Sequence, residues 1–377
     1  MKRPKSLYKS LLLFLLIGGL FLPIIQTKLS LIPVKILRGA IEAPPKDAPF
    51  IIQNWFTGNF QEQKEKYLNN SFGFRNIFIR IHNQLEYSFF SKINASNMVI
   101  GKDNYLFEEL YIKGYYGTDF VGMDSINNIM RRLKYINDTL KKLNKTLLLV
   151  FTPNKAAFYP EYIPDKYKSS VKNTNYASYL KLIQESGINY IDFNSYFISL
   201  KPKSKYILIP KNGSHWSMYG AALAGDSMVK YIEDVRHITM PKAIWKGIKL
   251  SQNDMFDLDI ESAMNLIAPL SSPQMAYPDI KFENDSTKTR PNVLVVGDSY
   301  YWVWITGYDI NNGFSKSSNF WFYNKKPNHL PPSQNELKET LAKQDIIIIL
   351  ATTHNWSDIG WGFIENTFNL YKRPKRL

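Results

Sequence analysis

The order of hydrophobic and polar residues predicts alternating helices and buried strands over most of the chain. Between residues 126 and 143 apolar residues recur at helical spacing, and the next segment, Thr146 to Phe151, is continuously apolar. This is typical of a helix that leads into a buried parallel strand. Similar units follow, with helical segments at 176–185 and 334–343 and apolar strands at 190–193, 292–296 and 345–351. Because each strand ends in polar or glycine residues, we predict an α/β fold with a doubly wound, mostly parallel sheet and a site along its carboxyl edge.

The same pattern divides the chain into three parts. Residues 1–27 are predicted to form an N-terminal signal-anchor or transmembrane segment, residues 28–95 a linker and a lead-in helical segment, and residues 96–377 the α/β domain. Within this domain the stretch from about 240 to 288 has weak periodicity. It is interpreted as an insertion of loops and short helices.

The N-terminal segment indicates where the protein resides. A basic run precedes Leu11 to Ile25, a stretch without any charged residue. A cleaved signal peptide would share this pattern, but no small-residue cleavage site follows closely, so an uncleaved anchor is preferred. The four basic residues before the segment favour a cytoplasmic N-terminus. We therefore predict a single-pass protein of the cell membrane with its main domain on the periplasmic, or extracytoplasmic, side.

Composition and charge narrow the functional classes. With 45% hydrophobic and 15% aromatic residues among 377, the chain is not predominantly disordered. Because it has no cysteine, disulfides, thiolate metal sites and cysteine nucleophiles are excluded. The two ends hold about half of the net charge of +15, the rest is spread along the chain, and no nucleic-acid-binding motif accompanies it. We predict no nucleic-acid partner, no metal and no cofactor; the diffuse positive charge suits an acidic polysaccharide or an anionic membrane surface.

Two motifs carry candidate chemistry. The strand at 292–296 runs directly into Gly297, Asp298 and Ser299. A serine at such a turn exposes its hydroxyl close to backbone N–H groups that bind an oxyanion, although Gly-Asp-Ser can also merely cap a helix. In the second motif His215 occupies a polar loop before an alanine-rich helix, where it could act as the general base for Ser299. The alternatives are a structural loop histidine and a base role for His354.

These residues carry a resemblance to a known family. GDSYY after a hydrophobic strand, and an upstream HWS before a helix, resemble the SGNH-hydrolase-like domain of the alginate O-acetyltransferase family, of the AlgX and AlgJ type. Further resembling stretches are NWFTGNF, FGFRN, GKDNYLF and TPNKAAFYPEYIP. The resemblance covers roughly residues 50–370 and has the histidine motif before the serine, as in that family.

The resemblance implies an SGNH-hydrolase-like fold and an O-acetyltransferase. Ser299 would form an acyl-enzyme and pass the acyl group, in the simplest case acetyl, to hydroxyls of an exported cell-surface polysaccharide. It further implies a membrane-bound acyltransferase as the source of acyl groups. Two alternatives stay open: a polysaccharide deacetylase or esterase with the same residues, and a non-catalytic polysaccharide-binding assembly subunit.

One departure from the family concerns the residue that orients the histidine. The family pattern is Asp-x-His-Trp, whereas this chain has Gly213 in place of the aspartate. The candidates to replace that aspartate are Asp298, Asp192 and the Asn212 amide. For oxyanion or substrate binding, the candidates are the backbone N–H of Ser299 or Tyr300, together with Asn154 and Lys155 after the first predicted strand.

Aromatic residues are dense around these motifs. They could stack on sugar rings, but core packing accounts for at least half of them. The residues concerned are Tyr300, Tyr301, Trp302, Trp304, Trp216 and Trp356.

Overall fold

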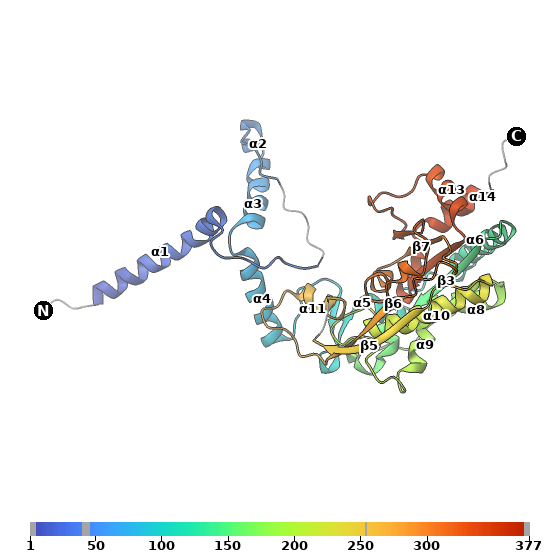
Figure 1. Ribbon diagram of the computed structural model, residues 1–377. Coiled ribbons are helices and arrows are strands. Elements are labelled where there is room, and N and C mark those ends of the chain that lie inside the picture. Colours follow the sequence, from blue (N-terminus) through green and yellow to red (C-terminus); the bar gives the residue numbers. More distant parts are fainter. Residues whose placement is uncertain (1–4, 40–45, 253–254, 373–377) are drawn as a thin grey trace. The chain divides into compact units, whose positions relative to one another are not determined.

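The computed structural model describes residues 5–39, 46–252 and 255–372, which form two compact units (Figure 1). The N-terminal unit contains the described residues up to Ser96 together with Glu261–Leu270. The α/β unit contains Asn97–Ile260 and the described residues from Ser271 onward.

Helices make up the N-terminal unit. The longest is α1 (Lys5–Leu29), and its part from Tyr8 to Leu29 is long and apolar enough to cross a membrane. At 1.5 Å per residue these 22 residues span about 33 Å, against a hydrocarbon core of about 30 Å. The other helices are α2 (Ile52–Phe56), α3 (Asn59–Ser71) and α4 (Arg75–Phe90). Arg80 and Asn83 of α4 donate hydrogen bonds to the carbonyl oxygens of Leu266 and Met264, which explains why segment 261–270 clusters with this unit.

A five-stranded, wholly parallel sheet forms the centre of the α/β unit, with the strand order β4-β3-β9-β7-β8. This confirms the predicted fold class. The strands are β3 (Thr146–Thr152), β4 (Asn189–Asp192), β7 (Val293–Gly297), β8 (Asn319–Phe322) and β9 (Ile346–Thr352). The sequence pattern did not predict β8, because in this short edge strand only Trp321 is buried.

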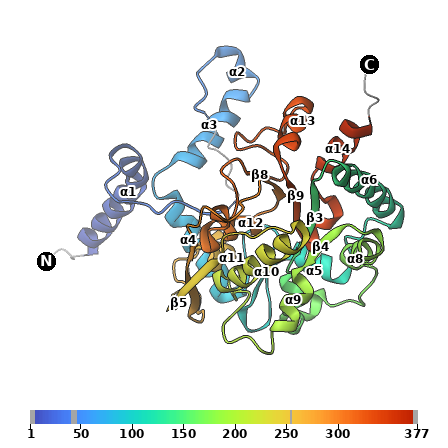
Figure 2. The same cartoon turned by 45° about the vertical axis from the view of Figure 1, so that its right-hand side comes forward.

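Helices cover both faces of this sheet (Figure 2). Alternate residues of β3 point to opposite sides, so Leu147 and Leu149 join one core and Leu148 and Val150 the other. On the first side lie α6 (Met123–Lys142), α8 (Asn175–Ser186), α13 (Gln334–Lys343) and α14 (Phe363–Lys372). On the second lie α5 (Glu109–Tyr116), α7 (Lys155–Phe158), α9 (Phe193–Leu200), α10 (Met218–Arg236) and α12 (Tyr300–Val303).

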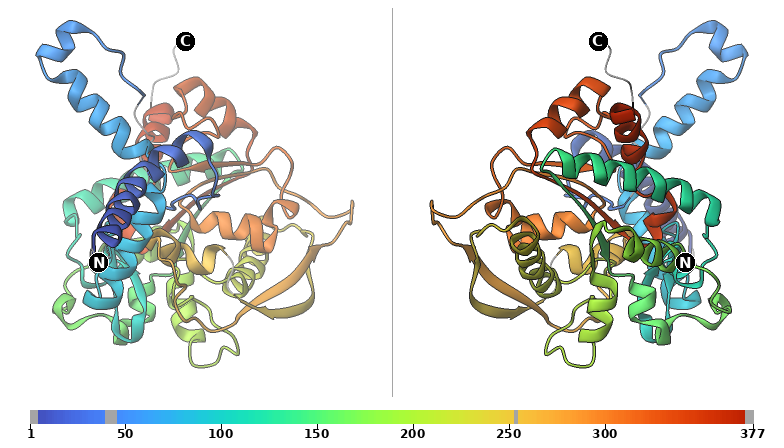
Figure 3. Two further views of the ribbon diagram at one scale, coloured as in Figure 1. Left: turned by 90° about the vertical axis from the view of Figure 1, so that its left-hand side faces the viewer. Right: turned by 90° about the vertical axis from the view of Figure 1, so that its right-hand side faces the viewer.

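Two antiparallel strand pairs complete the unit. The short strands β1 (Met98–Ile100) and β2 (Leu106–Glu108) precede α5, while β5 (Ala243–Ser251) and β6 (Met275–Phe282) form a hairpin that projects from the unit (Figure 3). Between β5 and β6 lie a 3₁₀ turn at Met255–Leu258 and α11 (Asp259–Met264). The prediction of loops and short helices for 240–288 was therefore wrong for this hairpin. Because most of β5 is exposed, it lacks the apolar run by which the buried strands were recognised.

Candidate active site

Ser299 lies at the carboxyl end of β7, where the chain turns into α12. It is half-buried, whereas Asp298 and Tyr300 on either side are buried. The Asp298 carboxylate accepts hydrogen bonds from the Tyr300 backbone N–H (3.1 Å) and from the backbone N–H (2.6 Å) and hydroxyl (2.5 Å) of Thr352. The turn that presents the serine is thus attached to the end of the neighbouring strand β9.

His215 is held beside this turn by the loop that precedes α10. The Trp216 ring packs in the core, with its centroid 4.8 Å from that of Trp304 and 5.2 Å from that of Tyr300. The Tyr300 hydroxyl lies 2.7 Å from the carbonyl oxygen of Ser214. Residues on both sides of His215 are therefore fixed by the helix that follows the serine.

The imidazole of His215 connects the serine to a carboxylate. Its Nε2 lies 2.7 Å from Ser299 Oγ, and its Nδ1 lies 2.5 Å from Asp259 Oδ2. The Asp259 carboxylate also accepts the backbone N–H and the hydroxyl of Ser214, each at 2.7 Å. A hydroxyl, an imidazole and a carboxylate linked in this order have the geometry of a nucleophile, a general base and the group that orients the base.

Asp259 comes from the insertion between β5 and β6. It is the first residue of α11, and the turn before it is attached to β6 because the Tyr277 hydroxyl donates to Asp257 Oδ2 (2.5 Å). The sequence pattern did not identify this residue. The one signal present is a group of acidic residues in a stretch without periodicity, and nothing in it identifies a contact with a histidine 44 positions earlier.

The three predicted orienting groups have other positions. Asp298 stabilises the serine turn, as described above. Asp192 caps α9 by accepting the Ser195 backbone N–H (3.0 Å), and it also accepts the Tyr176 hydroxyl (2.7 Å). Asn212 is buried within the histidine loop. The prediction is corrected accordingly: Asp259 is the partner of His215 Nδ1.

The backbone explains why the family's aspartate would not fit at Gly213. A Cβ atom placed on this glycine would lie 2.6 Å from the carbonyl oxygen of Phe256 and 2.9 Å from the carbonyl carbon and oxygen of Asp257. Backbone atoms just before Asp259 thus occupy the space that a side chain at position 213 requires. The carboxylate of Asp259 approaches the imidazole from this neighbouring segment instead.

Burial and charge act in opposite directions on the His215–Asp259 pair. Burial alone would lower the pKa of His215, but the charge and hydrogen bond of Asp259 raise that pKa above its ordinary value. For Asp259, burial alone would raise the pKa, but His215 and Ser214 outweigh it and hold the pKa below the ordinary value. Each partner therefore favours the charged form of the other.

A buried lysine holds the histidine loop in place through hydrogen bonds to its backbone. Lys155 Nζ donates hydrogen bonds to the carbonyl oxygens of Gly213 (2.5 Å) and Lys211 (2.7 Å). Burial lowers the pKa of Lys155 to about 7, although the carboxylates of Asp259 and Glu108 oppose this shift. Glu108, at the end of β2, is a second carboxylate that the sequence did not predict for this site; burial and then Asp259 raise its pKa.

The predicted oxyanion or substrate groups belong to the framework of the site. The Asn154 side chain caps α7 by accepting the Ala156 backbone N–H (2.7 Å), and its amide donates to the carbonyl oxygen of Tyr111 (3.0 Å). The Lys155 ammonium is bound to the histidine loop, and the Tyr300 N–H is bound to Asp298. These bonds give Asn154, Lys155 and the Tyr300 N–H partners within the protein, and their contact with an oxyanion or a substrate stays a prediction.

His354, the rival base, lies after β9 in a 3₁₀ segment (Thr353–Asp358). Its ring centroid is 4.5 Å from that of Tyr111, and burial lowers its pKa to about 4. The histidine at hydrogen-bond distance from Ser299 is His215.

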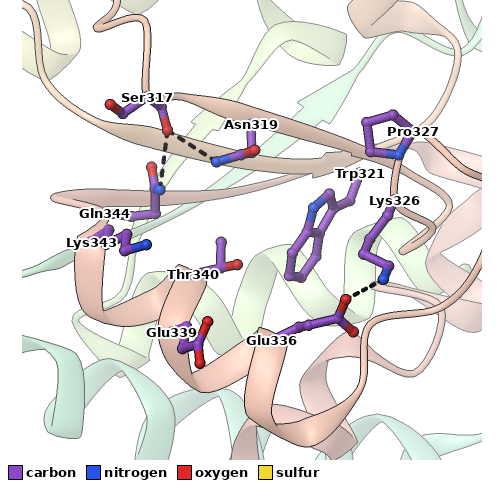
Figure 4. A pocket seen from close by; sticks show the side chains of 10 residues that line it. All are labelled: Ser317, Asn319, Trp321, Lys326, Pro327, Glu336, Glu339, Thr340, Lys343 and Gln344. Atoms are coloured by element: carbon purple, nitrogen blue, oxygen red, sulfur yellow. Dashed lines mark hydrogen bonds and ion pairs between the residues drawn. The ribbon is translucent and has the colours of Figure 1, made fainter.

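A separate pocket of about 410 Å³ lies between β8 and α13 (Figure 4). Trp321, Thr340 and Gln344 line it, and Lys326 forms an ion pair with Glu336 at its edge. None of Ser299, His215 and Asp259 lines this pocket. Among the described residues, no group of three or more His, Asp or Glu side chains is arranged to hold a metal ion.

Comparison with known proteins confirms the family resemblance. Residues 98–252 match the SGNH hydrolase-like domain of acetyltransferase AlgX, a range that includes His215 and ends before Asp259 and Ser299. A curated relative, the "Probable alginate O-acetylase AlgJ" of Azotobacter vinelandii, is 21% identical over 171 residues, which are 45% of this chain and 42% of that protein. The match thus spans less than half the length of this relative.

Solved structures of similar proteins include an AlgJ and an AlgX. The O-acetyltransferase domain of Pseudomonas putida AlgJ aligns with a TM-score of 0.46 at 14% identity, covering 72% of this chain and 99% of that one. Pseudomonas aeruginosa AlgX aligns with a TM-score of 0.47 at 15% identity, covering 74% of this chain and 71% of that one.

Proposed function

We propose, on the premise that residues 98–252 are similar to an AlgX-type acetyltransferase domain, that this chain transfers an acetyl group to hydroxyls of an exported polysaccharide. The observation that carries the proposal is the hydrogen-bonded series Ser299–His215–Asp259 at the carboxyl edge of a parallel sheet. The name of the curated relative, an alginate O-acetylase, supports a uronic-acid polymer as acceptor. A membrane-bound acyltransferase would supply the acetyl groups.

In this reaction the acetyl group passes through Ser299. His215 Nε2 takes the proton of Ser299 Oγ as the oxygen attacks the carbonyl carbon of the donor. When the tetrahedral intermediate collapses, the same nitrogen protonates the leaving group, and acetyl-Ser299 remains. An acceptor hydroxyl then gives its proton to His215 and attacks the carbonyl carbon of the ester. As this second intermediate collapses, His215 returns the proton to Ser299 Oγ, which leaves with it. In the described part of the chain no acceptor engages the Ser299 backbone N–H, so we assign it to the developing oxyanion.

The test separates transfer from hydrolysis. We expect the detergent-solubilised chain to release nitrophenol from p-nitrophenyl acetate and, when alginate oligosaccharides are present, to place acetyl groups on them, detected by mass spectrometry. Release of acetate alone, with every oligosaccharide left unmodified, would identify an esterase. Absence of any acyl-enzyme with several ester donors would favour a binding subunit and refute the enzymatic proposal.

We further propose that α1 anchors the chain in the cell membrane, with the α/β unit on the extracytoplasmic side. The full chain is then expected in the membrane fraction and to resist extraction by alkaline carbonate, because Tyr8–Leu29 contains the stretch Leu11–Ile25, which has no charged or polar side chain. Deletion of residues 5–29 should release the protein into the soluble fraction. If the deletion variant still sediments with membranes, the attachment lies elsewhere in the chain.

A further inference from the structure

A large aromatic side chain is exposed one helical turn after Ser299. The backbone N–H of Trp302 donates to the carbonyl oxygen of Ser299 (3.1 Å), and residues three apart share one face of a helix. Trp302 is 41% exposed, whereas Tyr301 and Val303 are buried. The candidate nucleophile, just before the short helix α12, and an exposed tryptophan ring on that helix are therefore one turn apart.

The exposed ring continues into a row of aromatic side chains on β8 and beyond. Phe320 and Phe322 lie on one face of β8, and the Trp302 centroid is 5.0 Å from the first and 6.2 Å from the second. From Phe322 the Tyr323 ring is 4.3 Å away, and from Tyr323 the Trp361 ring is 4.9 Å away. We call these five residues the aromatic row. Apart from Trp302 its members are half-buried, so part of each remains accessible.

The aromatic row reaches the candidate active site. Phe322 pairs in register with Gly297, and the Tyr323 backbone N–H donates to the Gly297 carbonyl oxygen (3.0 Å), two residues before Ser299. Burial, followed by Asp298 and Glu108, raises the pKa of Tyr323 to about 12, so the phenol keeps its proton and can donate it to a ligand.

The lysines around the aromatic row favour an anionic ligand. Residues 310–335, which include β8, contain three lysines and no acidic residue, although Lys326 is paired with Glu336 just beyond this range. Lys316 precedes the strand, Lys325 follows it, and both are exposed. A positively charged surface attracts an anionic chain, while aromatic faces pack against the apolar faces of a ring whose hydroxyls stay hydrated.

We propose that the aromatic row binds successive pyranose rings of an anionic acceptor polysaccharide and brings one hydroxyl to acetyl-Ser299. The inference rests on the proposed function and extends it by assigning the acceptor site. Because the aromatic row starts one turn from the nucleophile, it gives the polymer a fixed path past Ser299. The sugar rings stack on the aromatic side chains along this path, and the reacting hydroxyl lies near Tyr323 and His215.

The test compares Trp302→Ala with Tyr135→Ala in the full, detergent-solubilised chain. Tyr135 is a matched control because it is 40% exposed and lies on α6. We expect Trp302→Ala to weaken binding of an alginate hexasaccharide, measured by calorimetry, by about tenfold and to raise KM for this acceptor similarly. Trp302→Phe should restore most of the affinity, and cellohexaose should bind more weakly than the anionic hexasaccharide.

Three outcomes overturn the aromatic row as the acceptor site: no hexasaccharide binding by the unaltered chain, equal binding by Trp302→Ala, or an equal loss in Tyr135→Ala. Failure of the proposed function gives a different result. In that case Ser299 is not acylated in any variant, while calorimetry still reports whether Trp302 contributes to saccharide binding.

Discussion

Ser299→Ala is expected to abolish formation of the acyl-enzyme and to leave the fold intact. Removing the nucleophile of a serine hydrolase costs on the order of 10⁶-fold in turnover, because the rest of the site acts only through that oxygen. The side chain is small and half-buried at a strand end, so its loss removes little packing. Intact-mass spectrometry after incubation with a sulfonyl fluoride or an acyl ester should show an adduct on the natural chain and none on the variant.

Ser357→Ala is the matched control, since this serine is exposed in the 3₁₀ segment after β9. It should form the adduct at the natural rate, and all variants should unfold at the same temperature. His215→Ala should lose the adduct almost as completely as Ser299→Ala. An undiminished adduct in Ser299→Ala would refute the nucleophile assignment, and full activity in His215→Ala would transfer the base role to another residue such as His354.

Three of the four strands that the sequence predicted, β3, β7 and β9, are those whose burial appears in consecutive residues, whereas the fourth, β4, is only half-buried. Every residue of β3 and β9 is buried, so each appears as an apolar run with polar or glycine residues after it. The exposed strand β5 and the edge strand β8 give no such run, because their stability comes from pairing with a neighbouring strand. Periodicity detects burial along one segment, and it does not detect pairing between segments.

The residues of the candidate site likewise fall into those that a local sequence pattern predicts and those that depend on contacts between distant segments. Ser299 and His215 were predicted because each occupies a local motif, a strand-to-helix turn and a loop before a helix, whose backbone can be inferred from nearby residues. Asp259 could not be predicted, because its role depends on the path of an insertion that returns to the histidine loop. Glu108 and the carbonyl contacts of Lys155 likewise arise from segments far apart in the sequence.

Asp259→Asn is expected to lower turnover by about 10⁴-fold, the loss that follows when the orienting carboxylate of a triad is replaced by its amide. The amide would donate where His215 Nδ1–H donates in the natural chain, so the imidazole would be held in the wrong tautomer. The pH–rate profile should also move. Because Asp259 raises the pKa of His215, natural activity should increase with pH through a value above about 6.5. In the variant burial remains without that carboxylate, so the pKa of His215 falls and the acid limb shifts to lower pH.

Substitutions at Gly213 provide the control for Asp259. They test whether the carboxylate that orients His215 must come from the insertion between β5 and β6. A Cβ at Gly213 would overlap the carbonyl groups of Phe256 and Asp257, so Gly213→Ala should already displace the segment that carries Asp259 and lower turnover. Gly213→Asp should be at least as impaired, although it restores the family's motif, and adding it to Asp259→Asn should rescue nothing. A double variant that regained activity would show that position 213 can still orient His215 and would contradict the role assigned to Asp259. The assigned role would also be contradicted if Asp259→Asn kept the turnover of the natural chain and an unchanged acid limb of the pH–rate profile. That result would mean that the contact of Asp259 with Nδ1 does not affect the orientation or the pKa of His215.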